Sequence, residues 1–133
     1  MKELNVIILI IGLTFSISIT SCKKEEPKVF GCTDPTSVNY NPSATDDDGT
    51  CQYEGYVTFY YKSSDSNATV TVGGKTGYIT DYYPTHIPSC GSPGCANFTL
   101  PVGTYSFYAS RPHQWWKGIV VVTKNDCFLM LLQ

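Results

Sequence analysis

Apolar and polar residues alternate along the chain from residue 55 onward, which is the period of a half-buried β-strand. The first such segment, at 56–61, places every second side chain on one face. At 68–74 two valines alternate with threonines, and the paired glycines that follow indicate a tight turn. The residues predicted to face the core in these two strands are Val57, Phe59, Tyr61, Val70 and Val72.

The same alternation continues to the end of the chain. The segment at 97–110 is predicted to be a hairpin turning at 101–103, and the segments at 117–123 and 127–133 flank a turn at 125–126. Six or seven short strands with regular turns predict an all-β fold, a small β-sandwich over residues 55–133. The inward residues of the hairpin are predicted to be Phe98, Leu100, Tyr105, Phe107 and Ala109.

The first residues have a different character. Lys2 precedes an apolar run at 6–19, which is too short for a comfortable membrane span and ends in small residues before Cys22. This layout predicts a secretory signal. The ending "ITSC" resembles the bacterial lipobox, which implies a lipoprotein signal peptide at 1–21 and a diacylglycerol on Cys22. A plain secretory signal, with Cys22 in a disulfide, and a transmembrane anchor are the alternatives.

Residues 22–30 would then form a lipidated tether that holds the protein on a membrane. The charged run "KKEEP" at 23–27 resembles the lysine-plus-acidic export signal of Bacteroidetes lipoproteins. That resemblance implies an outer-membrane lipoprotein that faces the cell exterior, and a periplasm-facing lipoprotein is the alternative.

Charge is concentrated in one segment. The chain carries a net charge of −2, yet residues 29–54 hold Asp34, Asp46, Asp47, Asp48 and Glu54 without a single base. No dense basic stripe of the kind that nucleic acid requires occurs anywhere, so the charge pattern excludes a nucleic-acid partner.

The acidic residues lie in a loop, 31–54, that contains Cys32 and Cys51. Export permits a disulfide between these cysteines, which would stabilise the segment by about 3 kcal/mol. Crowded carboxylates favour a hard cation such as calcium, although the spacing is not that of an EF-hand. The alternative is a solvated loop whose Asp and Asn side chains form turns. The candidate calcium ligands are Asp34, Asn39, Asn41, Asp46, Asp47 and Asp48.

Two resemblances extend this reading. The segment "GCTDPTSVNYNPSATDDDGTC" resembles a G-C-T-D-x-x-A-x-N-Y-N-x-x-A-x-x-D-D-G-S-C repeat of secreted, often adhesive, Bacteroidetes proteins, with Ser37 and Thr50 as departures. It implies a disulfide-closed surface spacer that is compatible with calcium binding and has no enzymatic role. The strings "VTVGG" and "LPVGTYSF" resemble PEGA-type and other Ig-like surface modules, which implies the sandwich fold and no particular chemistry.

Three further cysteines leave their pairing open. Cys90 and Cys95 could close on each other, or Cys127 could pair with either of them, and one thiol would stay free. A redox site is disfavoured because no Cys-x-x-Cys occurs.

The sequence contains few of the residue patterns that indicate an enzyme. His86 and His113 have no acidic neighbour in sequence, no G-x-S-x-G is present, and the acids of the second half lie beside predicted turns. The chain is therefore predicted not to be an enzyme. Aromatic residues with a nearby arginine suit stacking on a glycan or on a protein surface, although one tryptophan could instead plug the end of the sandwich. The candidate binding residues are Tyr82, Tyr83, Arg111, Trp115 and Trp116.

The sequence thus predicts a non-catalytic adhesion or ligand-binding module on the cell surface. A structural accessory subunit of an outer-membrane assembly and, less favoured, a degenerate hydrolase are the alternatives.

Overall fold

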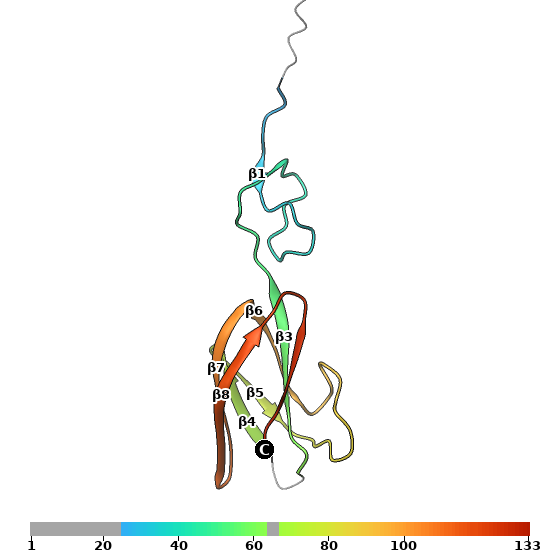
Figure 1. Ribbon diagram of the computed structural model, residues 1–133, viewed down its shortest axis with the longest axis vertical. Helices are drawn as coiled ribbons and strands as arrows, with labels where there is room; N and C mark the ends of the chain where they lie inside the picture. The colour runs from blue at the N-terminus through green and yellow to red at the C-terminus, as the bar shows by residue number, and fades with distance from the viewer. Residues whose placement is uncertain (1–24, 64–66) are drawn as a thin grey trace, which may run out of the picture.

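The computed structural model describes residues 25–63 and 67–133, so the predicted signal peptide and Cys22 lie outside the described residues. A narrow looped segment at one end of the molecule leads into a domain made of strands (Figure 1). The described residues contain no helix, and therefore none with the length and apolar character needed to cross a membrane.

The looped segment, residues 29–53, has little regular structure. Its two short strands, β1 (Phe30–Gly31) and β2 (Asp46–Asp47), pair in parallel, and the remainder consists of turns and bends. A disulfide joins Cys32 to Cys51 across the segment. We call residues 29–53 the acidic loop.

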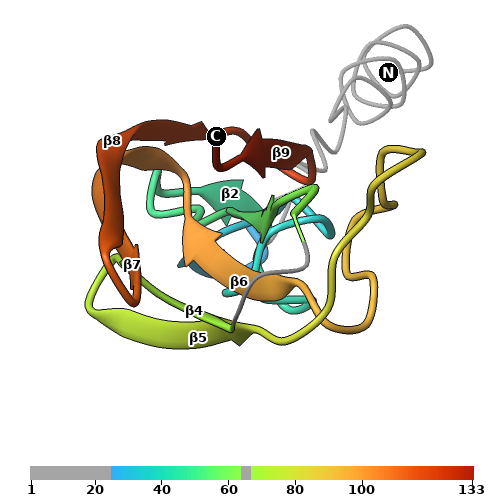
Figure 2. The same cartoon turned by 90° about the horizontal axis from the view of Figure 1, so that it is seen from below.

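The second part contains two sheets. The three-stranded sheet has the order β6-β3-β9, and the four-stranded sheet has the order β5-β4-β7-β8. Seen along the domain, the strands from β5 to β8 curve around one side of β6 (Figure 2). The strands are β3 (Glu54–Tyr60), β4 (Ala68–Val72), β5 (Lys75–Ile79), β6 (Ala96–Pro101), β7 (Gly103–Arg111), β8 (Gln114–Val122) and β9 (Cys127–Leu131).

The facing sides of both sheets form one apolar core. Phe59 lies at its centre and packs edge-on against Phe98 from its own sheet and Phe107 from the other, with ring centroids 5.8 and 4.9 Å away. All residues predicted to face inward are buried except Tyr105, which is half-buried and packs against the core. The all-β expectation is therefore confirmed, with the two sheets packed as a β-sandwich.

The predicted hairpin at 97–110 is wrong. β6 pairs with β3, whereas β7 pairs with β4 and β8, so the chain passes from one sheet to the other at Val102. Alternation identifies the side chains that face the core but not the strand that supplies the hydrogen bonds. A hairpin and a crossing between facing sheets bury the same residues, so the sequence pattern could not separate them.

The pairing of β4 with β5 agrees with the sequence. Val72 pairs with Lys75, so Gly73 and Gly74 form a two-residue turn in which both have positive φ, 55° and 74°. Such primed turns match the twist of paired strands and favour glycine.

The outer faces of the two sheets differ in their cover. The connection between β5 and β6 lies over the outer face of the three-stranded sheet. In it, Gly91 donates its backbone N–H to Thr58 Oγ1 at 3.1 Å, and the Cys90–Cys127 disulfide joins it to β9. Thr58 is consequently buried although it points away from the core. Over the four-stranded sheet, most of the outward side chains are exposed.

Candidate functional site on the outer face of the four-stranded sheet

Outward side chains of β5, β4, β7 and β8 form a continuous surface, which we call the aromatic face. Burial alternates along these strands, so every second residue belongs to this surface. Its members are Thr69, Thr71, Thr76, Tyr78, Thr104, Ser106, Tyr108, Ser110, Trp115, Lys117, Ile119 and Val121.

Three aromatic side chains dominate this face. Tyr78 is 63% exposed, Tyr108 is 52% exposed and Trp115 is 60% exposed. Large aromatic side chains gathered on one exposed surface are typical of binding hot spots.

The strand register fixes how the aromatic residues are spaced. Tyr78 lies opposite Thr69 and Trp115 lies opposite Ser110, while Thr69 and Ser110 pair in the centre of the sheet. Tyr78 and Trp115 thus end one row across four strands, about 14 Å apart at the backbone. Thr69 and Ser110 are only half-exposed between them. Tyr108 lies in the next row, diagonal to Trp115.

The face is almost uncharged. Lys117 is its single charged member among the described residues, and its Nζ lies 5.7 Å from the centroid of the Trp115 ring. Lys75, at the start of β5, points away and donates to the backbone oxygen of Thr99. Threonine and serine hydroxyls supply the remaining polarity, as in the Thr71–Thr76 pair at 3.3 Å.

The aromatic face reaches the end of the domain that lies away from the acidic loop. Trp115 follows the turn between β7 and β8, and that turn lies at the opposite end of the domain from β1 (Figure 1). A chain held by its N-terminal segment would present this end outward.

The predicted binding cluster is divided in the structure. The strand predicted at 117–123 begins earlier, at Gln114, so Trp115 and Trp116 both belong to β8, where neighbouring side chains point to opposite faces. Trp116 turns toward the core, donates its indole N–H to the backbone oxygen of Gln133 at 2.9 Å, and lies beside Arg111. Arg111 in turn donates to Gln114. Trp116 therefore occupies the end of the sandwich, the alternative that the sequence left open.

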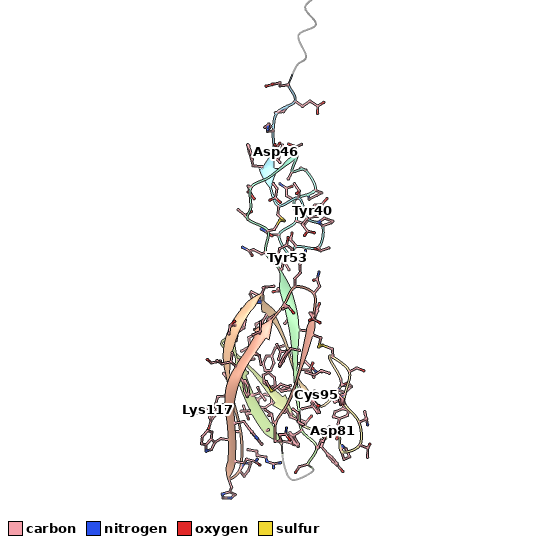
Figure 3. The ribbon with its side chains drawn as sticks, viewed as in Figure 1. Tyr40, Asp46, Tyr53, Asp81, Cys95 and Lys117 are labelled. Atoms are coloured by element: carbon pink, nitrogen blue, oxygen red, sulfur yellow. A yellow bond between two sulfur atoms is a disulfide. The ribbon has the colours of Figure 1, made fainter. Side chains whose placement is uncertain are left out.

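Tyr82 and Tyr83 lie elsewhere. Tyr83 donates its hydroxyl to the backbone oxygen of Pro93 at 2.7 Å, within the connection between β5 and β6. Asp81, which precedes Tyr82, and Lys117 lie on opposite sides of the domain (Figure 3). The five predicted residues do not form one patch, so only Trp115 belongs to the aromatic face.

Tyr78 and Tyr108 were missed by the sequence reasoning. The alternation that assigned Phe107 and Ala109 to the core would also have assigned Tyr108, which lies between them, to the outside, and the same period applied to β5 exposes Tyr78. Exposed aromatic residues on one sheet face are therefore readable from the sequence once strand membership is known.

The predicted calcium ligands are spread over separate turns of the acidic loop. Asp47 accepts the backbone N–H of Gly49, Asp48 accepts that of Thr50, and Asn41 accepts that of Ser43. Asn39 bridges Thr50 and Gln52, and the side chain of Asp46 binds the ammonium of Lys28 at 2.8 Å.

These contacts belong to separate turns. Among the described residues, no three acidic, histidine or cysteine side chains converge on a point that could hold a metal ion. In the structure the Asp and Asn residues act as turn-forming groups that satisfy the backbone, and the calcium site stays a prediction.

Asp34 links the acidic loop to the sandwich. One oxygen of its carboxylate accepts hydrogen bonds from Lys124 Nζ at 2.7 Å and from the Tyr53 hydroxyl at 2.8 Å, and the other accepts the backbone N–H of Thr36. Lys124 also lies 3.9 Å from the centroid of the Tyr53 ring. We call Asp34, Tyr53 and Lys124 the joint.

The contacts within the joint shift the pKa values of its three residues. Hydrogen bonds from Lys124 and then from Thr36 hold the pKa of Asp34 well below its usual range. The hydrogen bond with Asp34 raises the pKa of Lys124 and that of Tyr53. The joint is therefore most stable when Asp34 is ionised and Lys124 is protonated.

The sandwich also contains a cleft and a buried free cysteine. A cleft of about 420 Å³ lies on the outer side of β3 and β6, lined in part by Tyr56, Asn97 and Gly91. Cys95 is buried with a free thiol, and burial raises its pKa, so its thiolate is disfavoured.

No protein-family model matches the chain, and no curated protein matches it.

Proposed function

We propose that the chain is a surface lipoprotein whose sandwich domain binds a ligand without catalysis, and that the aromatic face is the binding surface. The observation that carries the proposal is the exposure of Tyr78, Tyr108 and Trp115 together on one sheet face. Aromatic side chains supply large contact area at low conformational cost, which is why they dominate binding hot spots.

The N-terminal part of the molecule fits a role in holding the sandwich away from a membrane. A lipid on Cys22 would hold the N-terminal end at a membrane, and the acidic loop would act as a spacer between that membrane and the sandwich. The ion pair between Asp34 and Lys124 favours one orientation of the spacer relative to the domain. An Ig-like or PEGA-like role is compatible with the architecture, because many surface domains share the sandwich without sharing its strand order.

The second candidate is a structural subunit of an outer-membrane assembly. It would use the same face as a permanent interface with one protein. The two functions differ in whether the purified chain binds a free ligand or remains attached to a fixed partner through washing.

The test compares the full chain, purified in detergent, with the variant Trp115→Ala/Tyr108→Ala. Both are immobilised and exposed to a panel of neutral polysaccharides, acidic polysaccharides and proteins such as gelatin. We expect retention of at least one probe by the parent and its loss in the variant. The control is Tyr56→Ala, which removes a comparably exposed tyrosine, 49% exposed, from the other sheet.

Two results of this experiment would contradict the proposal. Equal retention of every probe by the parent and by the double variant would show that the aromatic face is not the binding surface. Equal loss in the control variant would mean that the effect arises from any exposed aromatic residue rather than from this face.

A further inference from the structure

The aromatic face has a composition that discriminates between classes of ligand. Six of its twelve members carry small hydroxyl side chains, and one member is charged. Resting on the proposed function, we infer that its ligand is an extended, uncharged glycan that lies across the four strands.

The shape of the surface argues for an extended ligand. Small molecules are bound in concave sites that enclose most of their surface. The aromatic face is instead the outer side of an open sheet, on which Tyr78 and Trp115 stand at opposite edges. Only a ligand that spans about 14 Å reaches both of them. A polymer of several sugar rings has that length, whereas a single sugar does not.

The charges argue for an uncharged ligand. The described residues of the face include no carboxylate to hold a cation and only Lys117 to hold an anion. An acidic polymer would need a row of basic side chains, as binding to a polyanion requires. Lys75 and Lys124 do not supply one, because Lys75 is turned toward Thr99 and Lys124 is bound to Asp34.

The side-chain chemistry matches the two kinds of surface that a sugar ring presents. The flat, C–H-bearing side of a pyranose packs on an aromatic ring, and its ring hydroxyls both donate and accept hydrogen bonds. Tyr78, Tyr108 and Trp115 supply the rings. The threonine and serine hydroxyls between them are also both donors and acceptors. Thr69 and Ser110, between the outer aromatic residues, are placed to bond a sugar whose ring stacks at either end.

A protein partner fits the same surface less well. Protein interfaces are enriched in aromatic residues and arginine but depleted in serine. The face therefore has the aromatic anchors of a protein interface but, among its described members, none of the arginines.

The test measures the affinity of the full chain, in detergent, for neutral polysaccharides (mannan, xylan and soluble β-glucan), with polygalacturonate as the acidic comparison. We expect binding to at least one neutral polymer, with affinity that hardly changes as salt is raised. Trp115→Ala should weaken it about tenfold or more, and Tyr108→Ala should weaken it by a smaller factor. Tyr56→Ala should leave it unchanged. The fluorescence of Trp115 should change on binding, so that Trp115→Ala removes the signal while Trp116 remains.

The possible outcomes distinguish failure of the glycan inference from failure of the aromatic face as the binding surface. Retention of gelatin alone, lost in Trp115→Ala, would overturn the glycan and keep the aromatic face as a protein-binding surface. Preference for polygalacturonate that fades with salt would overturn the neutral ligand. Failure to bind any polysaccharide would also overturn the inference. Binding of neutral polymers that survives Trp115→Ala and Tyr108→Ala would overturn the proposed function, because the ligand would then use another surface.

Discussion

The acidic loop and the sandwich are stabilised in opposite ways. In the part of the sandwich that the structure describes, fifteen buried apolar residues, Phe59 among them, form one cluster. In the acidic loop the large apolar side chains Phe30, Val38 and Tyr40 are exposed. The loop keeps its shape through the Cys32–Cys51 disulfide and through Asp and Asn side chains that bond its backbone.

This difference follows from size. A segment of about twenty-five residues cannot bury enough apolar surface to offset its conformational entropy, so a disulfide and polar side chains must stabilise it instead. The sandwich has an apolar core, so the outer face of its four-stranded sheet is not needed for stability and is available for the proposed binding. The comparison predicts that substitutions of buried apolar residues damage the sandwich, and that loss of the Cys32–Cys51 disulfide or of the turn-forming Asp and Asn side chains damages the acidic loop.

The largest expected effect is in the sandwich core. Phe59→Ala removes a fully buried ring that contacts Phe98 and Phe107, and should lower the free energy of unfolding by about 3–5 kcal/mol. Chemical denaturation followed by tryptophan fluorescence measures it. The matched control, Val38→Ala in the acidic loop, should change stability by less than about 0.5 kcal/mol. A similar loss in both variants would contradict the comparison.

The next effect is confined to the acidic loop. The variant Cys32→Ala/Cys51→Ala removes the disulfide, and should destabilise the loop by about 3 kcal/mol while the sandwich stays folded. Amide hydrogen exchange should show lost protection at residues 30–52 and unchanged protection in β3 to β9. The control, Cys90→Ala/Cys127→Ala, opens the disulfide beside the three-stranded sheet and should instead lower the melting temperature of the sandwich. Retained protection of the loop without its disulfide would show that side-chain hydrogen bonds suffice.

The sequence predicted more of the sandwich than of its connections. Alternation identified the inward residues of β3 and β4 because burial on one face imposes a period of two. It could not show that β6 pairs with β3 while β7 pairs with β4, because strand pairing depends on contacts between segments that are distant in sequence. The partner of Cys127 was open for the same reason, since Cys90 and Cys95 lie only five residues apart.

The candidate site was predicted only in part. Trp115 was selected for its residue type, and the structure adds Tyr78 and Tyr108, whose shared face becomes visible only when the four strands are placed in register. Trp116 was selected for the same reason, but its side chain packs against the core at the end of the sandwich. Residue type suggested binding, but the strand period decides which of two adjacent tryptophans meets solvent.

A smaller effect is expected at the joint. The pKa of Asp34 is lowered in the folded protein, so its contribution is complete above the ordinary carboxyl pKa near 3.9 and is lost as pH falls through the folded value. The pKa of Lys124 is raised, so its contribution is complete below the ordinary ammonium value and is lost as pH rises through the folded one. The joint should therefore loosen in acid and in strong alkali and stay closed between them.

The variant Asp34→Asn removes the charge that Lys124 binds and should loosen the joint at neutral pH. Residual dipolar couplings would show the acidic loop and the sandwich reorienting independently, with the sandwich itself unchanged. The control is Asp48→Asn, since Asp48 also has a lowered pKa but bonds only Thr50 within its own turn. A joint that stays rigid in Asp34→Asn, or that loosens equally in the control, would show that the ion pair does not set the orientation.

The smallest effect is expected from calcium. The carboxylates of Asp46, Asp47 and Asp48 bond to separate partners, a lysine side chain and two turn backbones, so a shell would require these turns to open first. Millimolar calcium should therefore raise the melting temperature of the loop by less than about 1 °C, and no more than magnesium does. Exchange protection at residues 30–52 measures this with and without each ion. A calcium-specific gain in protection that Asp47→Asn abolishes would show that binding energy exceeds the cost of opening the turns, and would make the loop a metal-stabilised spacer.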